Sequence, residues 1–380
     1  MRVGVLRVFL ISLFLLAVLS TPLLAGLSAN TRFNVQLLPE VPGLRRDQET
    51  HIAEINNDGC VVGYSPVIAE GVYLNHAIYY DGTAMRDLGA EFFPGQNSYA
   101  KDINDNVNGT QIVTQVYRDG SYVYDVGHPD LPLVRVEDPE LADIPPAYAP
   151  GPYVSCINDY GAMAGTYTYA GPEPWPIGLP GLGNDINNLG VVVGSNNYWA
   201  SSYPDALVGT QNIADQVEGP YLNCSEALKI NDSGQVVGKS WYQPDSTPLR
   251  GWRYDMNSGG ATFLSNFFPS GINNAGIMSG GSDPGYYYRS DGDASIADAN
   301  GTHFMMHDLM NLPTGVDDLY HVTADAINDN MQVAGRCWYV VDGVGRQGEY
   351  VATPVVPEPS SLLALGSGFL GLMGVIRRRK

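Results

Sequence analysis

Residues 55–63 read Ile-Asn-Asn-Asp-Gly-Cys-Val-Val-Gly, and six further copies of this pattern follow along the 380-residue chain. Each copy begins Ile-Asn, continues with Asp or Asn and a short turn, and closes on Gly. The copy at Ile103 reads as two residues shorter than the others, ending at Gly109. Repeats of about 40 to 50 residues with this content predict an array of small β units. The repeated asparagines are Asn56, Asn104, Asn158, Asn187, Asn231, Asn273 and Asn328.

The first repeat shows what each unit contains. Two short apolar runs, residues 53–55 and 60–65, flank an Asn-Asn-Asp-Gly turn. Asn and Asp tolerate left-handed backbone, and Gly adopts positive φ without a steric cost, so this turn favours a tight hairpin. Residues 76–80 and 85–88 read as a third and a fourth strand. Four short strands make one blade of a β-propeller.

The two ends of the repeat region predict how the array closes. The last repeat has a strand at residues 349–353 but no fourth strand after it, whereas residues 33–38 form an apolar run before the first repeat. An N-terminal strand that completes the last blade would hide two open sheet edges. We therefore predict an all-β fold, a propeller of seven four-stranded blades over residues 33–355. Six blades are the alternative, because residues 167–185 would have to supply two outer strands in a short interval.

Two further motifs in the first repeat point to a family. His76-Ala77-Ile78 and Met85-Arg86-Asp87-Leu88-Gly89 follow its hairpin, and the sixth repeat keeps residues 306–309, Met-His-Asp-Leu. This arrangement resembles the HAF family of extracellular bacterial repeats, although Ile78 replaces the family's aromatic residue. The resemblance implies a repeat fold and an extracellular setting, but no particular chemistry.

The N-terminus reads as an export signal. Arg2 and Arg7 bracket the start of an apolar run at residues 8–19, and small residues follow at Ala25 and Ala29. The run is shorter than the roughly 20 apolar residues that span a bilayer. We predict a cleaved signal peptide at residues 1–25, with a retained membrane anchor as the alternative.

The C-terminus has three parts in a fixed order: a Pro-Glu-Pro signature, an apolar stretch and a basic end. It resembles the PEP-CTERM sorting tail of Gram-negative bacteria, which an exosortase recognises. The resemblance implies that residues 356–380 are a sorting tail with a transmembrane segment at 361–376, removed after transient anchoring in the inner membrane. Delivery to the cell surface or to a polysaccharide-rich biofilm matrix would follow; a plain tail anchor is the alternative. The signal residues are Val356, Pro357, Glu358, Pro359, Arg377, Arg378, Arg379 and Lys380.

The charge of the chain excludes one class of partner. The net charge is −20, from 20 basic and 40 acidic side chains. Without Arg2, Arg7 and the last four residues, 14 basic side chains face 40 acidic ones, a net charge of −26. A body with this much negative charge repels nucleic acid and anionic lipid. We therefore expect membrane contact only through the C-terminal segment.

Few residues suggest a chemical site. Each Asn-Asx turn offers one or two oxygen ligands, whereas calcium prefers several oxygen ligands from one loop. We therefore predict that the turns are structural and that no cofactor binds, with calcium binding as the alternative. No nucleophile elbow, phosphate-binding loop or dinucleotide fingerprint occurs. Cys60 and Cys337 lie in the first and last repeats, which become neighbours if the ring closes, so a disulfide between them is one prediction and buried free thiols are the other.

Two functions fit these features. The first is a non-catalytic propeller at the cell surface or in the matrix, which presents loops to a protein or an exopolysaccharide. The second is a propeller hydrolase or lyase that acts on extracellular polysaccharide. An enzyme should gather polar and acidic groups from different blades at one end of the channel, whereas a scaffold need not.

Overall fold

The computed structural model describes residues 27–40, 50–69, 71–105, 109–117, 119–128, 133–136, 153–166, 181–196, 203–219, 222–242, 248–282 and 294–355. The expected signal peptide and the expected C-terminal tail, with their apolar helices, lie outside these ranges. Within these ranges, no helix has the length and apolar character needed to cross a membrane.

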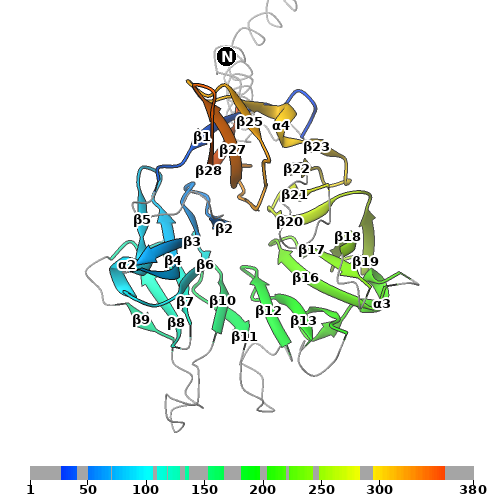
Figure 1. Cartoon of the computed structure of the whole chain (residues 1–380). Coiled ribbons are helices and arrows are strands. Elements are labelled where there is room, and N and C mark those ends of the chain that lie inside the picture. Colours follow the sequence, from blue (N-terminus) through cyan, green and yellow to red (C-terminus); the bar gives the residue numbers. More distant parts are fainter. Residues whose placement is uncertain are drawn as a thin grey trace, which may run out of the picture.

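Antiparallel sheets stand around a central axis like the blades of a propeller (Figure 1). Among the described residues, five sheets have four strands each, the closing sheet has six, and the third repeat forms a two-stranded hairpin. The all-β propeller prediction is therefore confirmed, but the prediction of seven four-stranded blades is not met. The structure supports six blades, with the hairpin of the third repeat between the second and the fourth repeat. Residues 167–180, expected to contribute outer strands there, lie outside the described ranges.

The strands follow the order of the repeats, from the axis outward within each blade. The first two blades are β2 (His51–Ile55), β3 (Val61–Ala69), β4 (Val72–Tyr80) and β5 (Met85–Asp87), then β6 (Ser98–Ile103), β7 (Gln111–Val116), β8 (Gly120–Asp125) and β9 (Val134–Arg135). The hairpin of the third repeat is β10 (Tyr153–Ile157) and β11 (Met163–Thr166). The next three blades are β12 (Gly181–Ile186), β13 (Val192–Asn196), β14 (Ala206–Val208) and β15 (Gln211–Asn212); β16 (Cys224–Ile230), β17 (Gln235–Trp241), β18 (Pro248–Asp255) and β19 (Gly260–Leu264); and β20 (Phe268–Ile272), β21 (Met278–Gly281), β22 (Ala294–Ala297) and β23 (His303–Met305).

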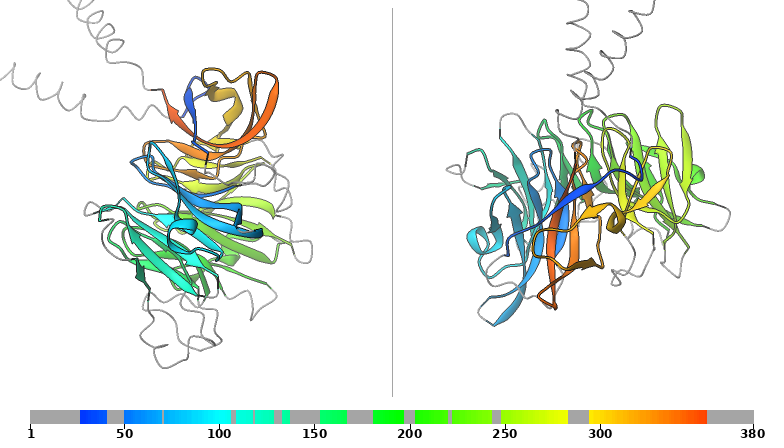
Figure 2. Two further views of the ribbon diagram at one scale, coloured as in Figure 1. Left: turned by 60° about the vertical axis from the view of Figure 1, so that its left-hand side comes forward. Right: turned by 90° about the horizontal axis from the view of Figure 1, so that it is seen from above.

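The closing sheet joins the two ends of the repeat region. Its strand β1 pairs antiparallel with β28, placing Phe33 opposite Pro354 (Figure 2). The N-terminal strand thus completes the last blade, as predicted from its apolar run. The turn between the two long strands lies at residues 342–343, so the last strand begins at Val344, before the residue 349 predicted from the sequence; the strands pair without a break as far as Val341 and Val344. The members of this sheet are β1 (Phe33–Leu37), β24 (Met310–Asn311), β25 (Asp318–Tyr320), β26 (Ala326–Ile327), β27 (Val333–Val341) and β28 (Val344–Pro354).

The inner hairpins explain the repeated sequence pattern. In the first blade Gly63 lies opposite Ile52, and a Cβ on Gly63 would come within 1.9 Å of the His51 carbonyl oxygen, so only glycine fits there. In the second blade Thr114 takes the corresponding place, opposite Ala100. The prediction of a shorter copy ending at Gly109 is therefore wrong: Gly109 belongs to a longer turn, since Ile103 pairs with Ile112.

In the described part of the chain, three short helices lie at the periphery: α2 (Leu88–Phe92), α3 (Ala214–Val217) and α4 (Met306–Leu309). The Asp87 carboxylate caps α2 by accepting a hydrogen bond from the Ala90 amide at 2.7 Å. Helix α4 corrects a detail of the repeat interpretation. The Met-His-Asp-Leu motif of the sixth repeat forms this helix, and the fourth strand of that blade precedes it.

The hydrophobic core is divided into clusters between neighbouring sheets. Val62 and Tyr79 of the first blade pack with Ile103 and Ile112 of the second. The largest cluster lies between the sixth repeat's blade and the closing sheet and contains Phe33. Each blade therefore depends on its neighbours for burial, so closing the ring stabilises every blade at once.

Candidate functional site: a double ring of Asn and Asp at the channel mouth

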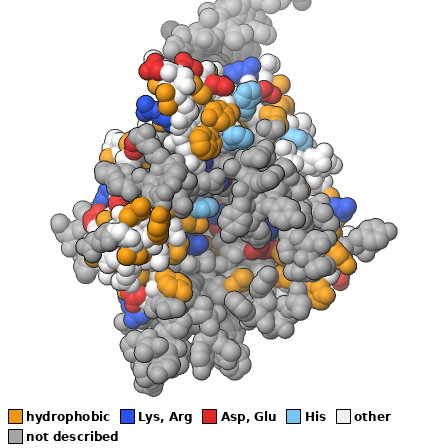
Figure 3. Space-filling view, in the orientation of Figure 1, with side chains coloured by type: hydrophobic (Ala, Val, Ile, Leu, Met, Phe, Trp, Pro, Cys, Tyr) orange, Lys and Arg blue, Asp and Glu red, His pale blue; other side chains and the backbone are white. Residues whose placement is uncertain are grey.

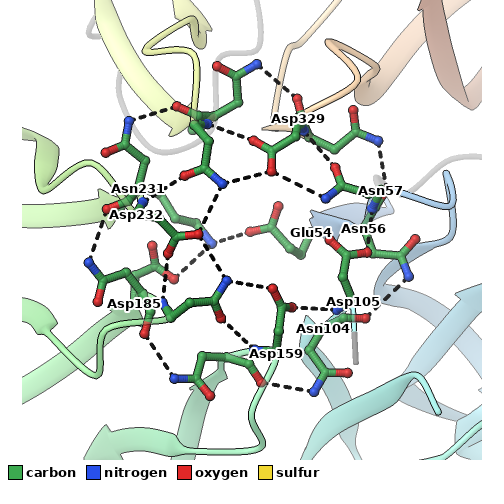
Figure 4. Close-up of a pocket in the computed structure, with 18 of the residues that line it drawn as sticks. Glu54, Asn56, Asn57, Asn104, Asp105, Asp159, Asp185, Asn231, Asp232 and Asp329 are labelled. Atoms are coloured by element: carbon green, nitrogen blue, oxygen red, sulfur yellow. Dashed lines mark hydrogen bonds and ion pairs between the residues drawn. The ribbon is translucent and has the colours of Figure 1, made fainter. Parts of the chain in front are cut away.

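Seven buried asparagines, one from each inner hairpin, form a closed ring around the axis (Figure 4). The amide Nδ2 of each donates to the main-chain carbonyl of the corresponding asparagine in the next hairpin. The last of these bonds, 2.7 Å from Asn328 to Asn56, joins the end of the repeat region to its start. Every one of these asparagines is 3 to 5% exposed.

The same side chains also hold their own turns. In the fourth repeat, Asn187 Oδ1 accepts hydrogen bonds from the amides of Leu189 and Val191, at 3.1 and 2.9 Å. Only a short side chain with a donor and an acceptor can fix its turn and reach the next one at the same time. This double requirement explains why Asn follows Ile in every copy.

A second ring uses the residue after each asparagine. The backbone amide of each member donates to the side-chain Oδ1 of the next, at 2.7 to 2.9 Å. This ring also closes, through the bond from Asp329 to Asn57. Its members are Asn57, Asp105, Asp159, Asn188, Asp232, Asn274 and Asp329.

Charged side chains lie beneath the two rings, each on the residue before the repeated isoleucine. Lys229 Nζ forms an ion pair with the Glu54 carboxylate and lies 3.9 Å from Asp185 Oδ1. Asp102 Oδ2 accepts the Ile157 amide at 2.7 Å, which links the second hairpin to the third. A cavity of about 150 Å³ is lined by these groups and by both rings.

Burial and neighbouring charges shift the pKa values of this cluster. Burial raises the pKa of Asp102 and of Asp185, and the nearby Glu54 carboxylate raises both further. Burial alone would lower the pKa of Lys229, but Glu54, Asp185 and Asp102 hold it well above its usual value. Lys229 is therefore the charged counterion of the buried acids at neutral pH.

Lys101, on the strand beside Asp102, shows the opposite shift. Burial lowers the pKa of Lys101, and the positive charge of Lys229 lowers it further.

The rings meet one criterion set for an enzyme, because polar and acidic groups from different hairpins gather at one end of the channel. Their hydrogen bonds, however, account for this gathering. Each carboxylate of the second ring uses Oδ1 to accept a backbone amide of the preceding hairpin. Among the described residues, no set of three or more His, Cys, Asp or Glu side chains is arranged to hold a metal ion. The hydrogen bonds of these carboxylates thus serve to close the ring.

The predicted cysteine pair does not meet. Cys60 packs in the cluster between the first two blades, and Cys337 packs in the cluster between the closing sheet and its other neighbour. The two side chains point to opposite sides of the first and last blades, so no bond joins them. All four cysteines are buried free thiols, and burial raises the pKa of Cys337 to about 12.

The turn asparagines sit where the repeat pattern put them, whereas the charged cluster escaped the sequence interpretation. Its signal was present: the residue before the repeated isoleucine is Glu54, Asp102, Asp185 or Lys229 in four copies. A charged residue at that position is not required by the hairpin, because the sixth repeat has Gly271 there. The sorting-signal residues lie outside the described ranges.

Comparison with known proteins supports the reading of the C-terminus. Residues 355–380 match the PEP-CTERM protein-sorting motif. The chain is thus a propeller-like all-β protein with a motif that implies export by way of an exosortase. A search of curated proteins found no match to the chain.

Several solved structures are distantly similar to this chain. They include the α-L-arabinofuranosidase PaAbf62A from Podospora anserina (9% identity, 87% of this chain and 99% of that chain, TM-score 0.33). A mutant Trypanosoma rangeli sialidase with trans-sialidase activity is 10% identical over 82% of this chain and 54% of that chain (TM-score 0.36). The subtype N11 neuraminidase-like protein of A/flat-faced bat/Peru/033/2010 is 10% identical over 86% and 96% (TM-score 0.34). At these identities and TM-scores the likenesses carry no argument for this chain.

Proposed function

We propose that this protein is an exported, non-catalytic propeller that presents its loops to a protein or polysaccharide partner at the cell surface or in the extracellular matrix. The observation that carries the proposal is the PEP-CTERM motif at residues 355–380. The motif starts directly after β28, which ends at Pro354, so no further domain separates it from the propeller. A signal peptide at residues 1–25 and the resemblance to HAF repeats fit the same destination.

The hydrogen bonds of the closing sheet support this arrangement. The Val355 amide donates to the Arg32 carbonyl at 2.7 Å, so the chain enters and leaves the propeller at the same end of the paired strands β1 and β28. Both predicted targeting segments therefore join the domain at the same place. While the tail holds the protein at a membrane, the other blades stay free to meet a partner.

The charge of the body narrows the class of partner. With a net charge of −26, the body favours neutral or cationic partners over anionic polymers. Most described sheets expose scattered large apolar side chains, such as Tyr73 and Tyr117, and Figure 3 shows hydrophobic and histidine side chains close together over the closing sheet. A polysaccharide hydrolase or lyase is the alternative; it has less support, since the carboxylates at the channel mouth are engaged in holding the ring.

Mass spectrometry of the protein from its native host tests the sorting step. Culture medium and envelope fractions are analysed separately for intact mass. We expect a surface or secreted form without the leader and without the residues after the Pro-Glu-Pro signature. Glu358→Gln should accumulate uncleaved in the inner membrane, whereas Glu40→Gln, at an exposed acid outside the tail, should be processed normally.

Two results would overturn the proposal. A wild-type protein that keeps its full C-terminus in the inner membrane would make the propeller a tethered periplasmic domain. Release of reducing sugars from matrix polysaccharide by the purified protein, abolished when carboxylates of the channel mouth are replaced, would establish the enzyme instead.

A further inference from the structure

The second ring at the channel mouth alternates between amides and carboxylates, except at one junction. Going around it, each of its three asparagines stands between two aspartates. A closed ring with an odd number of members cannot alternate throughout, so two like residues must meet once. With seven hairpins, the like neighbours are Asp105 and Asp159.

Where the ring alternates, the amides neutralise the carboxylates by hydrogen bonding. Asn188 Nδ2 donates to Asp159 Oδ2 and to Asp232 Oδ2, at 2.6 and 3.0 Å. Asn274 Nδ2 donates to Asp232 Oδ2 and to Asp329 Oδ2, at 3.2 and 2.9 Å. An aspartate between two amides is therefore well solvated by the protein itself.

Among the described residues, no side-chain amide donates to both carboxylates of the junction between Asp105 and Asp159. Asp105 Oδ1 accepts the Asn57 amide at 2.7 Å, and Asp159 Oδ1 accepts the Asp105 amide at 2.7 Å. Within the described part of the chain, Asp105 Oδ2 accepts no hydrogen bond. Asn57 Nδ2 turns away from Asp105, toward Asp329 Oδ2 at 3.4 Å.

The charges around Asp105 are mostly negative. Besides Asp159, the carboxylates of Asp58 in the first hairpin and Asp329 in the seventh act on it. Beneath it, the acids Glu54, Asp102 and Asp185 are countered by Lys229. Burial, opposed by the bond from the Asn57 amide and reinforced by the three aspartates, raises the pKa of Asp105 to about 6.

We propose that the Asp105–Asp159 junction binds one proton, shared between its two carboxylates, and that this proton completes the ring of side-chain hydrogen bonds at the channel mouth. A proton from water binds Asp105 Oδ2, and the resulting O–H donates to the Asp159 carboxylate. Two adjacent carboxylates that share a proton replace a repulsion by a strong hydrogen bond. The channel mouth is thus held more tightly in mildly acidic surroundings than in neutral ones.

Thermal unfolding of the purified mature protein between pH 4 and pH 8 tests this proposal. Replacing Asp105 by Asn keeps an acceptor for the Asn57 amide and supplies a donor toward Asp159, without any need for a proton. The midpoint of D105N should match that of the wild type near pH 4 and exceed it above pH 6.5 by roughly 2 to 4 °C. D159N also removes the pair of like charges, so the midpoint should lose the same dependence on pH, but it should be lower at every pH because the new amide NH2 replaces Oδ2, which accepts Asn188 Nδ2 at 2.6 Å.

The matched control is D232N, because Asp232 already lies between two amides. Its pH profile should keep the shape of the wild-type profile. Difference infrared spectra between pH 5 and pH 7 should show a protonated carboxyl band in the wild type and in D232N, and a weaker band in D105N, where buried acids such as Asp102 and Asp185 still contribute. Equal changes in all three variants, or an unchanged band in D105N, would overturn the proposal. So would a wild-type profile that becomes flat in excess CaCl2 but not in EDTA, because a cation would then occupy the junction.

Discussion

Removal of one asparagine from the buried ring should destabilise the whole propeller, and Asn231 gives the clearest test. Its Nδ2 donates to the Asn273 carbonyl at 2.8 Å and to Gln235 Oε1 at 3.0 Å. Its Oδ1 accepts the amides of Ser233 and Gln235 at 3.1 and 2.9 Å. With a net contribution of about 1 kcal/mol for each of these bonds, Asn231→Ala should lower the free energy of unfolding by about 4 kcal/mol.

Urea denaturation followed by tryptophan fluorescence measures this loss, because Trp241 and Trp252 are buried in the same blade. With an m-value of about 3 kcal/mol/M, the midpoint should fall by roughly 1.3 M. Asn300→Ala is the control: Asn300 is exposed, and its side chain makes no hydrogen bond to other described residues. If Asn231→Ala destabilises the protein no more than Asn300→Ala does, the hydrogen-bonded ring is not what closes the propeller.

Two further predictions concern buried charge and buried sulfur. Lys229→Met should cost about 3 to 5 kcal/mol at pH 7, because it leaves buried acids without a counterion. The raised pKa of Lys229 means that the wild type keeps this contribution at every pH below about 10.4, so the deficit of the variant should shrink only as acid protonates Asp102 and Asp185. Lys239→Met, which removes one ion pair with a single acid, Glu226, should lower the urea midpoint less than Lys229→Met does. The native protein should resist thiol reagents and release four reactive thiols on denaturation, since burial raises the pKa of Cys337 to about 12; mass spectrometry that finds a disulfide would contradict this.

The sequence predicted the parts of the fold that depend on local chemistry. The hairpins at the Ile-Asn turns and the closing strand at residues 33–37 follow from turn residues and apolar runs, and the structure contains both. The prediction of the repeat boundaries failed where the pairing of strands, and not the local sequence, sets the end of a copy. The glycine nearest to Ile103 was taken as the end of a copy, although the strand register places Thr114 there. In the third repeat the structure describes two strands, and most of the residues expected to supply two more lie outside the described ranges.

By itself, the sequence determined that seven similar hairpins exist and that each carries an Asn followed by Asp or Asn. A tight turn is a local structure, and its preference for these residues depends only on the few residues around it. Only the tertiary structure decided that these turns meet at one mouth of a channel and bond in closed rings. Glu54 and Lys229 belong to the first and the fifth repeat, and closure of the ring brings them together. Asp105 and Asp159 are like neighbours because they belong to consecutive repeats, whereas closure into a ring of seven requires at least one such like pair. A ring has a parity that a linear sequence does not have.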